Sequence, residues 1–350
     1  MFSLIRKNAR PTALRHLVSA VYRDVPPALP VSGVLPSHHI LCGGTYSPVF
    51  ARLAAESAVA ACPPEFRSSL RLFIHMDGIR SGKRGEYREW LGEINGIEIT
   101  YGRFGILSRD RIPGKWHQVM INDIVRDFAA EPHVAFIDAD LFMVGPGWFN
   151  AVRSMLGDSV FSLTVGQRPF ASFTTAGREY QAIRTQMFTV NTSLYRQLNT
   201  QRCNKDRRAL RSLWLEFPGL GFAVERPDTM IVPSLRAQAL GHTVIDVRED
   251  VEHCHVGGFS HLGLNKFHDF ECPERRKTIS GLVGQARLLS AVLEFFDEQG
   301  WGRFVDQDYR VNEHRMRAFI ETHATLRQLS YELPPTKHEQ AFAKIVAARR

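Results

Sequence analysis

The sequence predicts an α/β protein in which a mixed, mainly parallel sheet carries helices on both faces. Between residues 39 and 137, short segments that are apolar along their whole length alternate with segments of helical periodicity. Strands that are apolar throughout are typical of parallel sheets covered on both sides. In addition, 44% of the residues are hydrophobic and 23% are charged, which is ordinary for a globular protein with a sizeable core.

The alternation gives the elements of the first half in order. A proline-rich stretch at residues 26–36 ends a short N-terminal segment, because proline neither continues a helix nor donates to a strand ladder. Each apolar run that follows has the length of a strand, and each periodic segment has the length of a helix. We expect strands at residues 39–42, 70–75, 97–101 and 134–137, and helices at residues 48–61, 84–94 and 116–130.

The second half mixes strands with longer helices. A run rich in β-branched residues predicts a strand at 187–194, and an apolar stripe at helical spacing predicts a long helix at 278–298. We also expect strands at 160–165 and 243–247, helices at 207–216 and 311–329, and a loosely held basic helix at 337–350. These elements suggest an N-terminal extension and linker (1–36), one α/β domain (37–275) and a helical region packed on it (276–350).

The charge of the chain bears on its partners. The formal net charge is +8, which favours acidic partners such as a phosphorylated substrate or anionic lipid headgroups. The basic residues are dispersed and the chain has no recognisable nucleic-acid-binding module, so we expect no nucleic-acid partner. Residues 12–22 predict a basic amphipathic helix. That helix either docks on the main domain or lies on an anionic membrane.

Other features indicate the compartment. No apolar run is long enough to span a membrane, and residues 1–23 lack the order of charged and apolar regions that a signal peptide has. The five cysteines are scattered and form no Cys-x-x-Cys pair, which favours a reducing compartment. We therefore expect a cytoplasmic protein, with peripheral contact at the inner membrane face if residues 12–22 form an interfacial helix.

Two carboxylates follow an apolar strand in the segment VAFIDADLFMVGPGW at residues 134–148. Alternate residues of an extended segment face the same way, so Asp138 and Asp140 can act on one ligand while Ala139 points away. Ligands of α/β sheets bind beyond the carboxyl ends of the strands. Carboxylate oxygens suit hard cations, so this segment predicts a Mn²⁺ or Mg²⁺ ion that screens a diphosphate.

A third ligand is expected from the segment VEHCHVGGFSH at residues 251–261. In a strand, His253 and His255 face one side and Cys254 faces the other. Imidazole completes a mixed oxygen and nitrogen shell of the kind that manganese accepts, and we expect His255 to be the ligand. The alternatives are a histidine satisfied by hydrogen bonds and a separate zinc site, although the spacing fits no common zinc pattern.

The order of these motifs resembles nucleotide-diphospho-sugar transferases of the GT-A fold. It is most similar to glycosyltransferase family eight, which includes glycogenin-like and bacterial lipopolysaccharide galactosyltransferase-like enzymes. In that family a strand-borne Asp-x-Asp precedes a Phe-Asn strand, an Asp-Gln-Asp segment and a His-x-x-Gly segment, where this chain has FIDAD, FTVNTSL, ERPDTM and HVGG. The resemblance covers residues 38–262 and implies metal-dependent transfer of a sugar from a UDP-linked donor to a glycan, lipid-linked saccharide or protein.

The resemblance also implies roles for single residues. Asp138 would meet the donor ribose, Lys115 would reach a donor phosphate, and Gly257 and Gly258 would let the backbone approach the diphosphate. In an inverting enzyme Asp228 would be the general base, whereas in a retaining enzyme the leaving diphosphate would help to deprotonate the acceptor. The residues assigned to donor binding are Thr45, Tyr46, Asp77, Lys115, Asp138, Gly257 and Gly258, and those assigned to catalysis are Asn191 and Asp228.

Two other functions stay open from the sequence. A strand followed by Asp-x-Asp also resembles the start of haloacid-dehalogenase-type phosphatases, in which Asp138 would be the nucleophile. That family usually has Thr or Val where this chain has Phe142, and its motif opens the domain, whereas three βα units come first here. The other function is a non-catalytic GT-A-like protein that binds a nucleotide without metal or turnover.

Overall fold

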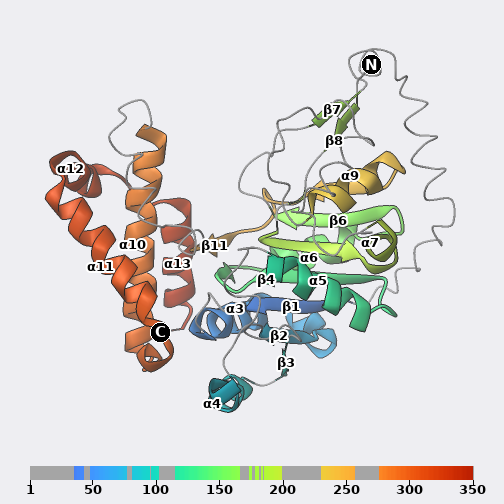
Figure 1. The fold of residues 1–350 in the computed structure, drawn as a ribbon, viewed down its shortest axis with the longest axis horizontal. Helices are drawn as coiled ribbons and strands as arrows, with labels where there is room; N and C mark the ends of the chain where they lie inside the picture. Colours follow the sequence, from blue (N-terminus) through green and yellow to red (C-terminus); the bar gives the residue numbers. More distant parts are fainter. Residues whose placement is uncertain are drawn as a thin grey trace.

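The computed structural model describes residues 35–42, 48–76, 81–94, 96–101, 115–165, 173–175, 178–180, 183, 185–198, 230–256 and 276–349. Its centre is a seven-stranded sheet (Figure 1) with the order β10 (Thr243–Asp246), β6 (Val160–Val165), β9 (Met187–Asn191), β4 (His133–Asp138), β1 (Ser37–Cys42), β2 (Leu72–Met76) and β3 (Ile97–Tyr101). Strand β9 runs antiparallel to both of its neighbours, and the other neighbouring pairs are parallel. The predicted α/β class with a mixed, mainly parallel sheet is confirmed.

Two small antiparallel pairs accompany this sheet, one made of β5 (Leu141–Met143) and β11 (His253–His255), the other of β7 (Phe173–Thr175) and β8 (Arg178–Tyr180). In the described part of the chain up to residue 239, the helices are α3 (Pro48–Ala61), α4 (Ser81–Gly92), α5 (Lys115–Asp127), α6 (Gly147–Met155), α7 (Thr192–Leu198) and α9 (Ile231–Ala239), with a 3₁₀ turn at Pro64–Ser69. After them come α10 (Arg276–Glu298), a 3₁₀ turn at Gly302–Phe304, α11 (Gln307–Thr322), α12 (Ala324–Glu332) and α13 (Lys337–Ala347).

The sheet separates two apolar cores, because alternate residues of each strand point to opposite faces. On one side, Ile40 and Ile137 join a core that includes residues of α3, α6 and the helices after residue 275. On the other side, Leu41 and Phe136 join a second core with residues of α5, α7 and α9. Burial on both faces explains why these strands are apolar along their whole length.

The C-terminal helices α10, α11, α12 and α13 pack together beside the sheet, and α13 contacts β11 (Figure 1). A capping box starts α13: the Thr336 hydroxyl accepts from the Glu339 N–H, and the Glu339 carboxylate accepts from the Thr336 N–H at 2.7 Å. The side chains of Ala341, Phe342 and Ile345 are buried. The expected loosely held helix is therefore wrong, because these apolar residues share one face that docks on the core.

Some element boundaries differ from the predicted ones. The strand expected at 187–194 ends at Asn191, because the Asn191 Oδ1 accepts from the Leu194 N–H at 3.0 Å and α7 begins. The helix expected at 311–329 is two helices that meet at His323. Strands β5 and β11 are three residues long, which is too short for periodicity to predict. The segments 12–22 and 207–216 lie outside the described residues.

A close approach of two backbones fixes the turn that leads into β11. A Cβ atom added to Gly147, the first residue of α6, would lie 2.0 Å from the carbonyl oxygen of Asp250. Because the obstacle is backbone, Gly147→Ala is expected to lower the free energy of unfolding by about 3 kcal/mol. The matched control is Gly145→Ala, where an added Cβ meets nothing within 4 Å. Chemical denaturation of both variants checks this, and equal stabilities would contradict the close approach.

Candidate metal centre

The Asp-x-Asp pair lies at the carboxyl end of a central strand, as the sequence predicts. Asp138 is the last residue of β4, and its backbone N–H donates to the carbonyl of Gln186 at 2.8 Å, extending the ladder with β9. Ala139 is fully buried in the apolar core, and Asp140 follows it just before β5. The chain therefore presents one carboxylate from the last residue of β4 and the other from the turn that follows, while the buried Ala139 between them anchors that turn.

A short antiparallel pair brings the distant histidine to this position. In the β5–β11 register, Leu141 lies opposite His255, and the Val256 N–H donates to the Asp140 carbonyl at 3.0 Å. The ladder thus pairs the backbone around Asp140 with the backbone around His255. The His255 Nε2 lies 3.5 Å from the Asp140 Oδ1. The expectation that His255 lies beside the Asp pair, more than a hundred residues away in sequence, is confirmed.

Asp138, Asp140 and His255, together called the Asp-Asp-His cluster, each offer a ligand atom, and these atoms lie within 4.8 Å of one another. Two ligands at about 2.0–2.3 Å from one cation lie up to about 4.6 Å apart, so small side-chain adjustments allow one ion to contact all three. In the described part of the chain, no other group of three or more such residues has this geometry. Two oxygens and one nitrogen suit a manganese-like cation.

The electrostatics of the cluster also fit a cation. The Oδ1 atom of Asp140 is buried and has no hydrogen-bond partner among the described residues. A buried carboxylate oxygen without a partner is unfavourable unless a cation or water satisfies it. Burial raises the pKa of Asp138, and the nearby charge of Asp140 adds to this, whereas the hydrogen bond from His117 has the opposite effect. A divalent cation would relieve the repulsion between the two carboxylates.

The sequence reasoning missed one histidine of this site, His117. Its Nε2 lies 3.1 Å from the Asp138 Oδ1, where it can donate to that carboxylate. His117 is the third residue of α5, the helix that crosses back before β4. The N-terminal turn of such a helix lies near the carboxyl edge of the sheet, which is where Asp138 ends its strand. The sequence signal that could have identified His117 is a histidine in the first turn of the helix that precedes the Asp-x-Asp strand.

The neighbouring His253 has a different environment from His255. Its side chain is buried, and its Nδ1 lies 3.1 Å from the carbonyl oxygen of Val251, to which it donates. Burial lowers the pKa of His253 to about 4, so the ring is neutral near pH 7. Cys254 between the two histidines is buried in the apolar core, consistent with the predicted alternation along the strand. His255, not His253, belongs to the Asp-Asp-His cluster.

The catalytic role expected for Asn191 is contradicted by its position. Antiparallel pairing places Asn191 opposite His133, the first residue of β4, whereas Asp138 is the last. Five residues of a strand span roughly 16 Å, so Asn191 lies at the opposite edge of the sheet. There its side chain accepts from the Leu194 N–H at the start of α7. Asn191 therefore has a helix-capping role.

The remaining predicted residues lie largely outside the described part of the chain. These are Thr45, Tyr46, Asp77, Asp228, Gly257 and Gly258. Lys115 is the first residue of α5, as expected from the helix start. Strands β1 and β2 end together at Cys42 and Met76, and Leu41 lies beside Asp138. The strands that precede Thr45, Tyr46 and Asp77 thus end at the edge of the sheet where the Asp-Asp-His cluster lies.

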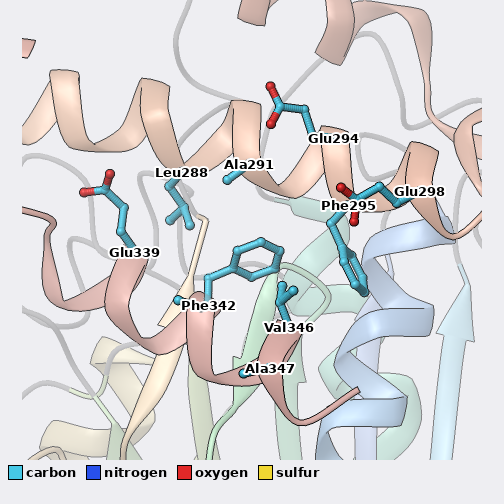
Figure 2. Close-up of a pocket in the computed structure, with 10 residues that line it drawn as sticks. Leu288, Ala291, Glu294, Phe295, Glu298, Glu339, Phe342, Val346 and Ala347 are labelled. Atoms are coloured by element: carbon cyan, nitrogen blue, oxygen red, sulfur yellow. The ribbon is translucent and has the colours of Figure 1, made fainter. Parts of the chain in front are cut away.

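A cavity of about 430 Å³ lies apart from the Asp-Asp-His cluster, between α10 and α13 (Figure 2). Leu288, Phe295 and Phe342 give it apolar walls, and Glu294 and Glu298 also line it. All of its lining residues come from these two helices. None belongs to the cluster, so this cavity is not assigned to the ligand of the Asp pair.

Comparisons with known proteins give only distant structural likenesses. No protein-family model matches the chain. No curated protein sequence matches it either. The mannosyltransferase PcManGT from Pyrobaculum calidifontis, solved in complex with GDP-Man and Mn²⁺, has a TM-score of 0.40 and 14% identity over 99% of this chain and 85% of its own.

Two further solved structures have lower scores. Mouse xyloside xylosyltransferase 1, in its apo form, has a TM-score of 0.37 and 12% identity over 60% of this chain and 83% of its own. The bifunctional glycosyltransferase WbbM, also in an apo structure, has a TM-score of 0.33 and 10% identity over 50% of this chain and 36% of its own. Likenesses at this level assign the chain to no family.

Proposed function

We propose that this chain is a metal-dependent glycosyltransferase that moves a sugar from a nucleotide-sugar donor, UDP-linked, to a glycan, lipid-linked saccharide or protein. The observation that carries the proposal is the Asp-Asp-His cluster, whose ligand atoms lie within 4.8 Å of one another at the carboxyl edge of the sheet. The order of the Asp-x-Asp strand and the later histidine segment along the chain agrees with it. A mainly parallel sheet with a Mn²⁺ or Mg²⁺ site beyond the carboxyl ends of its strands suits a reaction in which a nucleoside diphosphate leaves.

The residues of the site have distinct roles in this proposal. Asp140 and His255 would hold the cation, and Asp138 would contact both the cation and the donor ribose. The bound cation would screen the diphosphate and stabilise the leaving nucleoside diphosphate. His117 donates to Asp138 and fixes the orientation of that carboxylate.

Residues outside the cluster complete the proposal. Lys115, at the positively polarised start of α5, would reach a donor phosphate. Asp228 would accept the proton of the acceptor hydroxyl in an inverting reaction, and the leaving diphosphate would do so in a retaining one. Thr45, Tyr46 and Asp77 would contact the base and ribose, and Gly257 and Gly258 would approach the diphosphate.

Calorimetric titration of the whole chain with UDP tests the proposed function. UDP is expected to bind in the presence of Mn²⁺ and to bind at least about tenfold more weakly when EDTA removes the metal, because the diphosphate and the buried carboxylates repel each other. Equal binding with and without metal would point to the non-catalytic nucleotide-binding protein. Phosphate release from a generic phosphomonoester, without UDP binding, would point to a phosphatase. Either outcome would overturn the glycosyltransferase proposal.

The location of the enzyme is part of the proposal. Across the described ranges, none of the helices combines the length and the apolar character needed to cross a membrane. We propose that the protein works in the cytoplasm, and that the basic segment at residues 12–22 allows peripheral contact with an anionic membrane. A lipid-linked acceptor would bring the site to such a surface.

A further inference from the structure

Strand β11 has one edge that β5 does not cover. At the edge of β11 that faces β5, the Val256 N–H donates to the Asp140 carbonyl, and the Glu252 carbonyl accepts from the Val144 N–H. Alternate backbone groups of a strand point to opposite edges, so the His253 carbonyl and the His255 N–H point outward. Backbone polar groups at a sheet edge need partners, and a strand of three residues has little other support.

A histidine of the C-terminal helix lies at this outer edge. The Nδ1 of His338 lies 3.3 Å from the His255 N–H nitrogen and 3.3 Å from the His253 carbonyl oxygen. Without a proton, Nδ1 accepts from His255, and with one it donates to His253. The rings of His338 and His253 also lie with centroids 5.6 Å apart. One side chain of α13 thus contacts the backbone on both sides of Cys254.

The helix that carries His338 is itself fixed in place. The guanidinium of Arg287 on α10 holds the Glu339 carboxylate with distances of 2.8 and 3.1 Å. Phe342 packs near Phe142 of β5, with ring centroids 6.4 Å apart. Helix α13 therefore contacts both strands of the pair that joins Asp140 to His255, and it is anchored at its start by α10.

Resting on the metal site of the proposed function, we propose that His338 is a positioning residue that holds β11 so that the His255 imidazole stays beside Asp140. His338 contacts the backbone of β11 and not the His255 side chain. It therefore sets the position from which the His255 imidazole extends, and it does not itself coordinate the cation. The C-terminal helices thereby become part of the metal site. Loss of residues that orient a metal ligand typically lowers metal affinity about 10- to 100-fold.

Titration with Mn²⁺ alone, in the full chain, tests the positioning role. His338→Leu removes the ring nitrogen and is expected to weaken Mn²⁺ binding about tenfold. His338→Asn is expected to restore most of the affinity, because its amide places a polar atom near the position of Nδ1. His338→Gln carries the same group one carbon further out and is expected to restore less. Lys344→Met, which removes an exposed ion pair between α13 and Glu252, is the control and should bind as the parent does.

The variants separate this inference from the proposed function. If the parent binds Mn²⁺, Asp140→Ala does not, and His338→Leu binds as the parent does, then the metal site stands and the positioning role is overturned. If the parent itself does not bind Mn²⁺, the proposed function fails. If His338→Leu does not fold, the comparison of Asn with Gln decides: a clear advantage of Asn supports the contact at Nδ1, and equal affinities contradict it.

Discussion

Asp140→Ala is expected to remove Mn²⁺-dependent binding of UDP while the fold is retained. The Asp140 Oδ1 is buried without a hydrogen-bond partner among the described residues, and it lies 3.5 Å from the His255 Nε2. Its removal takes away a ligand without breaking a hydrogen bond of that oxygen. Because loss of a residue that merely orients a ligand already costs up to about 100-fold in metal affinity, loss of the ligand itself should exceed that.

The companion variants sharpen this test. His255→Ala also removes a ligand, so it is expected to weaken Mn²⁺ binding by more than about 100-fold and to lower turnover with it. His253→Ala is the matched control, because His253 lies on the same strand but outside the Asp-Asp-His cluster. Calorimetry with Mn²⁺ and then with UDP measures both affinities, and circular dichroism checks the fold. An Asp140→Ala protein that binds Mn²⁺ and UDP like the parent would remove the basis of the metal site.

The part of the site that the sequence predicts is local or strongly patterned. An apolar strand followed by Asp138 and Asp140 is a contiguous signal, and the parallel sheet places it at a ligand-binding edge. His255 could be chosen because it combines a metal-binding side chain with a neighbouring glycine pair. What the sequence does not contain is the register of β5 with β11, since strands of three residues carry no periodicity.

The residues that the sequence reasoning missed act through tertiary contacts. His117 and His338 each have an ordinary position on an amphipathic helix, and only the packing of α5 and α13 brings them to Asp138 and to the His255 backbone. Asn191 shows the opposite error. Its place in the motif order suggested catalysis, but Asn is also a preferred residue at the start of a helix, where its side chain accepts from the backbone N–H three residues later. Asn191 makes this hydrogen bond with Leu194, and the bond decides its role.

The protein is expected to lose stability in mild acid because of histidines buried in the sheet. His38 is fully buried, with its Nδ1–H donating to the Pro36 carbonyl at 2.8 Å and its Nε2 accepting from the Trp148 indole at 3.1 Å. A proton on Nε2 would point at the indole N–H, and two donors that face each other form no hydrogen bond. The folded protein therefore holds this ring neutral. Burial lowers the pKa of His38 to about 4, the charge of Arg71 adds to this, and the bond to Pro36 opposes it.

The direction of the pH effect follows from which state binds the proton first. In the unfolded chain a histidine titrates near pH 6.5, so as the pH falls below that value the unfolded state takes up a proton that folded His38 refuses until about pH 4. The stabilisation is therefore complete above pH 6.5 and is lost between pH 6.5 and 4, by about 3 kcal/mol for this residue. Burial also lowers the pKa of His75 to about 4 and that of His39 well below its usual value, so the three losses act in one direction.

Denaturant unfolding between pH 7.5 and 4 measures this loss. His38→Gln retains a group that can accept from the Trp148 indole but cannot titrate, so its free energy of unfolding should fall less steeply with decreasing pH than that of the parent. The slope, and not the absolute stability, is the readout, because the substitution also changes packing in the core. His314→Gln on the exposed side of α11 is the control and should keep the parental slope. A His38→Gln protein with the parental slope would show that His38 does not stay neutral as the fold requires.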